Sequence, residues 1–379
     1  TIICMISDTT ALNPSAKIVT PDTNVSSVDY QGIIADAGSQ TTYRAHYRNI
    51  ILNAQPFFGV HNAKTYFDCA SVNPRKTQHF VRYHNVPDIS NTHPQLHNSL
   101  VAASEKDLLY LTHKSVNVYN TARGVSKKVL DVRVPKFVDY DADTGLLLTT
   151  DGKNAVIYNV SRHTRSANNK FYADDDAIGR MRFIKHNGSA LVAVVGNHVD
   201  NHIWDPASER ISDTFQTTAF TNDIDYSERR GLFAAALDAV QVDLLDPRAK
   251  GSGVAALTGH LDFNFAAQFI GDNYLATGGQ DLTTRIWDVR TNKCLFVVKS
   301  TRYGIYALRY SATQKILCAL QGFLGISSYY FDGTEVVGVT DDLLGEMTGV
   351  ALTPCQRYAY VGSYQIRPGV AKFELCYDN

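Results

Sequence analysis

Acidic and aromatic side chains stand in the short polar segments that separate the apolar runs of this 379-residue sequence. The candidates for contact with a ligand are Asp175, Asp176, Asp262, Phe263, Tyr303, Phe323 and Glu346. Carboxylates and aromatic rings attract cationic groups such as amines, and binding residues are often carried by loops on a rigid scaffold. Acids in loops also cap turns or face solvent, so the inference concerns the set and not any single member. The set indicates a binding site for a cationic group.

Motifs of the common enzyme classes are absent from the sequence. It contains neither a G-x-S-x-G nucleophile elbow nor a G-x-x-x-x-G-K-[ST] phosphate loop. The fragment that begins at 251–253 resembles a dinucleotide fingerprint, but it precedes a strand-like run instead of a helix. His198 and His202 are interpreted as two sides of a hairpin turn, and the acidic run 174–176 has no further ligands beside it. We therefore predict a protein that is not an enzyme and holds no cofactor or metal.

Composition narrows the class of protein further. The chain has 36 Lys and Arg against 37 Asp and Glu, a net charge of -1, which argues against a nucleic-acid partner. With 44% hydrophobic and 19% charged residues, it has enough apolar material for a large core. The longest apolar stretches, such as 190–195, are far shorter than the roughly 18 residues of a membrane span. Six scattered cysteines without a C-x-x-C pair favour reduced thiols, and hence a cytoplasmic or nuclear protein.

A short pattern recurs along the chain: apolar or β-favouring residues followed by Asp, Asn or Glu and then a turn. The final residues of its seven copies are Asn120, Asn159, Asp205, Asp246, Asp288, Asp332 and Glu374. Successive copies are 39, 46, 41, 42, 44 and 42 residues apart, which matches the period of about 40 to 45 residues of a four-stranded propeller blade. We predict an all-β, seven-bladed β-propeller, with six or eight blades as alternatives if an end marker is misread.

The clearest copy, within 259–299, divides into four strand-like runs. They cover 263–270, 274–278, 283–289 and 295–299, with turn residues in every gap. The last copy leaves too few residues for a fourth strand, and an open ring would expose an unpaired edge. We therefore expect an N-terminal strand within about 66–86 to close the ring. On this reading 1–64 is an extension packed on the propeller, which spans 65–379, with its blades over about 95–379.

The same copy resembles a full WD-repeat signature. Gly259-His260, the Leu-Ala-Thr-Gly of 275–278, Asp281 and the Ile-Trp-Asp of 286–288 stand where that family has its characteristic residues. The resemblance implies a hydrogen-bonded chain of His260, Thr277, Asp281 and Trp287 that ties the inner loops to the third strand. Their role would be structural. The signature is partial around Trp204 and degenerate in the other five copies.

A more specific resemblance covers roughly 43–375. The run Gly-His-Leu-Asp-Phe of 259–263, the Leu-Ala-Thr-Gly-Gly-Gln-Asp of 275–281 and the Arg-Ile-Trp-Asp-Val-Arg of 285–290 are similar to a family of fungal and plant WD-repeat proteins. That family includes a substrate receptor of the GID (CTLH-type) ubiquitin ligase, which reads the N-terminus of its client proteins, with N-terminal Thr as the degron. The resemblance implies two partners, client N-terminal peptides and a ligase scaffold subunit, which would contact 373–379.

Two functions from different classes remain open at this point. In the first, the propeller is a substrate receptor that binds an α-amino group among the acidic and aromatic residues of its channel mouth, because a cationic amine needs a carboxylate partner. In the second, it is a general scaffold that joins other proteins through its rims and has no degron pocket. Neither involves nucleic acid or membrane.

Overall fold

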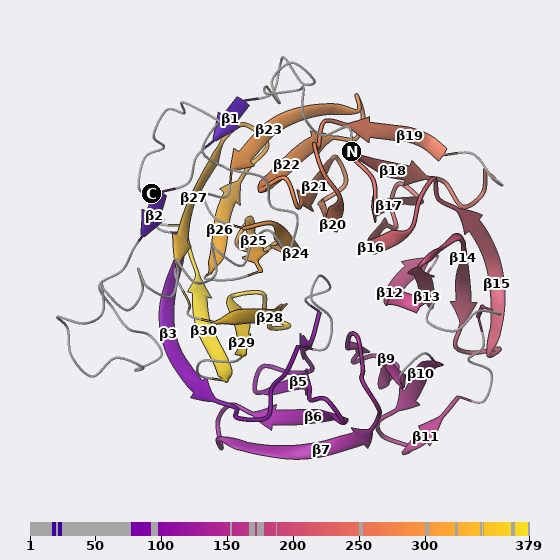
Figure 1. The fold of residues 1–379 in the computed structure, drawn as a ribbon, viewed down its shortest axis with the longest axis vertical. Coiled ribbons are helices and arrows are strands. Elements are labelled where there is room, and N and C mark those ends of the chain that lie inside the picture. Colours follow the sequence, from indigo (N-terminus) through magenta and orange to yellow (C-terminus); the bar gives the residue numbers. More distant parts are fainter. Residues whose placement is uncertain are drawn as a thin grey trace.

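The chain is described by a computed structural model over residues 17–19, 22–24, 77–91, 98–151, 154–166, 171–172, 178–186, 188–249, 253–299, 303–322, 325–341, 343, 345–364 and 368–377. Within these ranges it forms thirty strands and no helix. The strands make seven sheets arranged in a ring, so the protein is a seven-bladed β-propeller, as the repeat predicts (Figure 1). The described residues accordingly include no helix that could cross a membrane.

The strands of each blade follow one another from the centre outwards. Blades one to four contain β4 (Leu100–Ala102), β5 (Asp107–Leu111), β6 (Ser115–Asn120) and β7 (Val125–Asp131); β8 (Asp139–Asp141), β9 (Leu146–Asp151), β10 (Asn154–Asn159) and β11 (Thr164–Arg165); β12 (Ile178–His186), β13 (Ser189–Gly196), β14 (His198–Asp205) and β15 (Arg210–Gln216); β16 (Thr221–Ser227), β17 (Leu232–Leu237), β18 (Gln241–Leu245) and β19 (Gly253–Thr258). Blades five to seven contain β20 (Asn264–Ile270), β21 (Tyr274–Gly279), β22 (Thr283–Asp288) and β23 (Lys293–Lys299); β24 (Ile305–Ser311), β25 (Ile316–Gln321), β26 (Ile326–Phe331) and β27 (Val336–Asp341); β28 (Glu346–Leu352), β29 (Tyr358–Tyr364), β30 (Gly369–Leu375) and β3 (Gln78–Asn85). Six of the seven sequence markers fall at or just after the end of a third strand, and Glu374 lies one residue before the end of β30.

Closure of the ring depends on β3, which pairs antiparallel with β30 as the outermost strand of blade seven. Figure 1 shows these two strands side by side although they come from opposite ends of the sequence. Phe80 of β3 packs edge-on against Phe373 of β30 with ring centroids 5.8 Å apart. Phe373 and Leu375 are buried. The apolar part of the C-terminal segment therefore belongs to the core, which corrects the expectation that it forms a docking contact.

Two further strands extend the outer edges of neighbouring blades. β1 (Lys17–Val19) pairs in parallel with β23, and β2 (Asp22–Asn24) pairs in parallel with β27. Six residues of the N-terminal segment thus add a fifth strand to blades five and six. The rest of the predicted 1–64 extension lies outside the described residues.

The hydrophobic core is divided among the contacts between neighbouring blades. Seven clusters of buried apolar side chains occur in the described structure, and each draws its members from two adjacent blades. The outermost strands, such as β7 and β15, are mostly exposed, whereas β22 and β25 are buried along their whole length. Each blade therefore needs both neighbours to bury its two faces, and this holds the ring rigid around the central channel.

A bulge recurs near the start of the innermost strand in blades three to seven. In β24, for example, the pairing with β25 skips one residue between Ile305 and Ala307, and β12, β16, β20 and β28 show the same shift. A bulge leaves one residue unpaired and redirects its side chain. We call the end of the propeller at which these innermost strands begin the mouth face. The repeated bulges therefore aim a ring of side chains near that face.

Candidate functional site at the channel mouth

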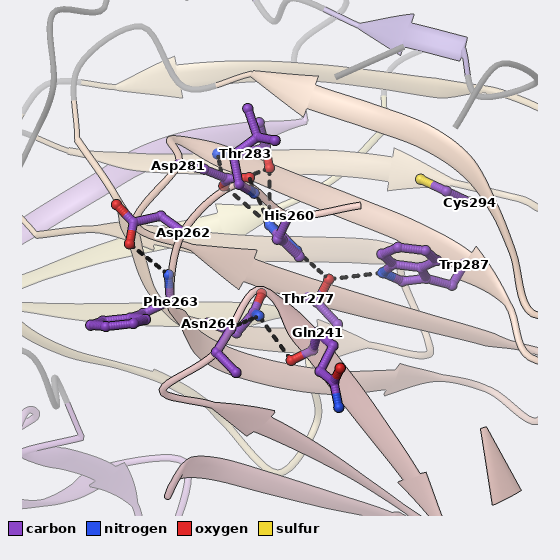
Figure 2. Close-up of polar contacts among 12 residues, drawn as sticks. Gln241, His260, Asp262, Phe263, Asn264, Thr277, Asp281, Thr283, Trp287 and Cys294 are labelled. Carbon is purple, nitrogen blue, oxygen red and sulfur yellow. Dashed lines mark hydrogen bonds and ion pairs between the residues drawn. The ribbon is translucent and has the colours of Figure 1, made fainter. Parts of the chain in front are cut away.

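Blade five contains a chain of hydrogen bonds through four buried side chains. His260 Nδ1 contacts Asp281 Oδ2 at 3.0 Å, and His260 Nε2 contacts Thr277 Oγ1 at 2.8 Å. Trp287 Nε1 donates to the same Thr277 oxygen at 2.8 Å. Figure 2 shows this chain running from Asp281 to Trp287, with Thr283 donating its hydroxyl to Asp281. The structure thus joins the loop before β20 to the third strand β22.

The protonation states in this chain follow from its donors. Trp287 Nε1 can only donate, so the Thr277 hydroxyl accepts from it and donates its own hydrogen to His260 Nε2. His260 is then neutral and donates from Nδ1 to Asp281. Burial lowers the pKa of His260, which agrees with a neutral ring. Burial alone would raise the pKa of Asp281, but its contact with His260 and the hydrogen bond from Thr283 bring this pKa down to about 2.

Two residues of the loop before β20 face the other way, towards solvent at the mouth face. Asp262 Oδ1 accepts a hydrogen bond from Phe263 N at 2.9 Å, and Phe263 O accepts one from Gln280 N at 2.8 Å. Figure 2 shows the side chains of Asp262 and Phe263 directed away from the His260 chain. The Phe263 ring remains 42% exposed. The structural chain therefore holds a loop whose opposite side presents a carboxylate and an aromatic ring.

An aromatic pair stands beside this loop at equivalent bulges of two neighbouring blades. Phe265 and Tyr306 are the residues skipped in the pairing of β20 and β24, and their rings stack with centroids 4.8 Å apart at 8°. Gly304 and Gly322 make room for Tyr306, since a Cβ added to Gly322 would lie 2.6 Å from the ring. Tyr306 is thus held rigidly, although no feature of the sequence had singled it out.

Electrostatics link Tyr306 to two carboxylates of the candidate set. Burial raises the pKa of the Tyr306 hydroxyl to about 12, and the charges of Asp262 and Glu346 contribute to the rise. Glu346, the first residue of β28, is half-buried and accepts a hydrogen bond from Asn91 Nδ2 at 2.7 Å. Burial also raises the pKa of Glu346 above its usual value. Carboxylates of blades five and seven thus both act electrostatically on one tyrosine of blade six.

The other predicted contact residues are placed differently. Tyr303 is buried, with 4% of its surface exposed. Asp175, Asp176 and Phe323 lie outside the described residues, so their part in the site stays a prediction. In the described part of the chain, no group of three or more His, Cys, Asp or Glu is arranged to hold a metal ion.

A buried charge network links β12 and β16, and Asp223 of β16 is part of it. Asp223 is 1% exposed, and its Oδ1 lies 3.5 Å from Arg180 Nε of β12. Arg182 of β12 in turn contacts Asp225 Oδ1 of β16 at 3.1 Å. Burial raises the pKa of Asp225 despite the attraction of Arg182. Two innermost strands are therefore joined by a buried charge network instead of offering an acidic rim.

The same network reaches further around the channel. Arg182 donates to Gln268 Oε1 of β20 at 3.2 Å, and Arg309 of β24 donates to Asn98 Oδ1 beside blade one at 3.1 Å. Burial, together with the charges of Arg182 and Arg180, lowers the pKa of Arg309 to about 10. The sequence signals for this network were the Arg-x-Arg and Asp-x-Asp patterns at matching places in two innermost strands. They were missed because the sequence of one innermost strand does not show which of its residues face the innermost strand of the next blade.

Comparisons with known proteins support the architecture. No protein-family model matches the chain. A stretch of 101 residues is 32% identical to the ribosome biogenesis protein YTM1 of Scheffersomyces stipitis, covering 25% of this chain and 22% of that protein. A stretch of 83 residues is 34% identical to the nuclear distribution protein nudF of Aspergillus niger, covering 21% of this chain and 19% of that protein. The chain thus spans about a fifth of the length of these curated relatives.

A solved structure gives the wider likeness. A chain in the crystal structure of a mitotic checkpoint complex matches with a TM-score of 0.66 at 17% identity, covering 82% of this chain and 96% of that chain. At that identity the likeness shows the fold alone. Together with the seven blades, these findings support one conclusion: the chain is a seven-bladed β-propeller, and its fifth blade contains the hydrogen-bonded chain from Asp281 to Trp287 that the WD-repeat resemblance implies.

Proposed function

We propose that this propeller is a non-enzymatic receptor that binds the N-terminus of client proteins at its channel mouth. The observation that carries the proposal is the loop before β20, which presents Asp262 and the exposed Phe263 at the mouth face, where Glu346 begins β28. A protonated α-amino group is small, cationic and rich in donors, so two carboxylates on a rigid frame complement it. The aromatic side chains offer apolar surface to the first side chain of the client.

The charges predict how binding depends on pH. An α-amino group has a pKa of about 8, so binding weakens above that pH as the amine loses its proton. Binding also weakens in acid as Glu346 is protonated, and burial raises the pKa of this carboxyl above its usual value. The affinity should therefore be highest between these limits.

The resemblance of blade five extends the proposal to a cellular role. The receptor would present its client to a GID (CTLH-type) ubiquitin ligase through a ligase scaffold subunit, and N-terminal Thr is the first residue we expect it to read. This role places it in the cytoplasm, the nucleus or both. The YTM1 and nudF likenesses neither require nor oppose that assignment, since each covers about a quarter of the chain or less.

Blade seven offers a matched pair of variants for the test. Glu346 pairs with Tyr364 at the mouth end of β29, whereas Glu374 pairs with Tyr358 at the opposite end. With peptides that differ in their first residue, we expect Glu346→Gln to weaken the best peptide roughly 10- to 150-fold, because a hydrogen bond to a charged group contributes about 1.5 to 3 kcal/mol. Glu374→Gln should leave the affinity unchanged. Equal affinities for both variants and the wild type would place the amine elsewhere.

The scaffold alternative is favoured by a specific surface. Phe220, Val240 and Phe263 are 47%, 49% and 42% exposed. Their loops are tied together, because Asp238 N donates to Phe220 O and Asn264 Nδ2 donates to Ala239 O. Contiguous exposed apolar side chains mark protein contact surfaces. If this patch carries the function, partners will bind through internal segments, and acetylation of their N-termini will not change the affinity.

A further inference from the structure

A cavity of about 580 Å³ opens between blades one and two. We call it the rim pocket, and it is lined by His113, Lys114, Asp131, Val132, Arg133, Val134 and Asp151. His113 and Lys114 form the turn between β5 and β6, the segment from Val132 to Val134 follows β7, and Asp151 ends β9. These turns all lie at the mouth face. The rim pocket therefore belongs to the same surface as the candidate site but lies away from its carboxylates.

One cationic side chain of the rim pocket, Lys114, is left without a carboxylate partner among the described residues. Asp131 pairs with Lys128 at 2.9 Å, and Asp151 pairs with Arg133 at 3.6 Å and Arg165 at 3.5 Å. Lys114 is exposed and has no ion pair among the described residues. Both carboxylates of the lining are thus paired, and Lys114 is the cation that remains available. An acidic group entering the cavity would meet Lys114 without having to displace an existing partner.

The wall of the rim pocket is both strained and fixed. Val134 has a φ of 47°, a backbone conformation that is unfavourable for a β-branched residue, and its side chain is 56% exposed. Val134 N donates to His113 O at 3.1 Å, Val132 N to Lys114 O at 3.0 Å, and Arg133 N to Asp151 Oδ1 at 2.7 Å. These bonds hold an apolar side chain outwards beside the cationic group. The wall can therefore contact the aliphatic part of a bound side chain.

A short series of contacts connects the rim pocket with the channel mouth. Glu346 of the candidate site is paired across the sheet with Tyr364. The Tyr364 ring packs edge-on against His113, with centroids 6.2 Å apart, and His113 lines the rim pocket. A client peptide that leaves the channel mouth at Glu346 and runs over blade one therefore reaches the rim pocket next.

We propose that the rim pocket takes an acidic side chain of the same client peptide, a few residues after the N-terminus bound at the mouth. This inference rests on the proposed function and adds a second requirement to it: the client carries Asp or Glu at a fixed distance from its first residue. Lys114 supplies the charge that selects the acid, and Val134 supplies apolar contact beside it.

The test uses fluorescent peptides that share their first residues and are otherwise uncharged, with a single Glu moved from position 3 to position 8. Glu at one or two neighbouring positions should tighten binding by about 2- to 5-fold, the range for an exposed ion pair. Added salt should remove this gain. Lys114→Glu should abolish the gain and shift the preference to peptides with Lys at that position. Lys127→Glu, the same change on the exposed outer strand β7, is the control and should change nothing.

The outcomes separate this inference from the proposed function. Binding that requires a free N-terminus but ignores both the position of Glu and the Lys114→Glu change would overturn the rim pocket and leave the receptor intact. A gain that persists in Lys114→Glu would likewise overturn it. If no peptide binds, or if binding ignores acetylation of the N-terminus, both proposals fail.

Discussion

Replacing Thr277 by Val tests whether the hydrogen-bonded chain of blade five stabilises the propeller. The Thr277 hydroxyl is the only partner that the described structure gives to Trp287 Nε1, at 2.8 Å, and it also contacts His260 Nε2 at 2.8 Å. Valine keeps the shape and removes the oxygen, so two buried polar atoms lose their partner. Each such loss costs about 1 to 3 kcal/mol, and we therefore expect Thr277→Val to lower the free energy of unfolding by about 2 to 5 kcal/mol.

Thr284 provides the matched control on the neighbouring strand. Like Thr277 it is 0% exposed, but its hydroxyl oxygen makes no hydrogen bond within the described part of the chain. Thr284→Val removes a buried polar atom without orphaning a partner, so it should be neutral or slightly stabilising. Urea unfolding followed by far-UV circular dichroism compares the two variants. Equal losses of unfolding free energy in the two variants, or a loss below about 1 kcal/mol for Thr277→Val, would show that the hydrogen bonds of Thr277 do not stabilise the blade.

Three further changes probe closure, packing and the channel. Burial lowers the pKa of His84 in the closing strand to about 4, so the folded state loses up to about 3 kcal/mol of stability as pH falls from 6.5 to 4. His84→Phe removes this titration and should flatten the plot of melting temperature against pH in that range. An unchanged plot would contradict the prediction. Gly278→Ala should lower the melting temperature, because a Cβ there would lie 2.5 Å from Ile305; an unaltered value would mean that β24 can shift. Asp225→Asn should lower the free energy of unfolding in urea by about 3 to 5 kcal/mol, because Arg182 loses its buried partner. Adding Arg182→Met should restore part of this loss. A double variant no more stable than the single one would show that the two residues are not coupled.

Much of the fold could be predicted because each blade carries its own local signal. The third strand of every blade ends near an acidic or amide residue, from Asn120 to Glu374, and this spacing alone indicates seven blades. The need for a closing strand followed from the length left after Glu374, and β3 lies within the predicted range. Local sequence and period therefore determined the architecture without any information on long-range contacts.

The site was less predictable because it depends on register and closure. Tyr306 is directed by a bulge in β24, and a bulge is a property of strand pairing that the sequence of one strand does not reveal. Asp223 and Arg180 lie in the innermost strands of neighbouring blades, and the sequence of either strand alone does not show that they face each other. Tyr303 is buried where an exposed ring was expected. The sequence thus locates the loops, but contacts with neighbouring blades determine how exposed each loop side chain is.

The most direct test of the receptor proposal is a matched titration of one peptide with a free or an acetylated N-terminus. It should use the best peptide from the first-residue series and wild-type protein at neutral pH, with fluorescence anisotropy as the readout. We expect saturable binding of the free amine and a loss of at least about 10-fold on acetylation, because the charge that pairs with Asp262 and Glu346 disappears. Equal affinity for the two peptides would contradict the receptor proposal and favour the scaffold function.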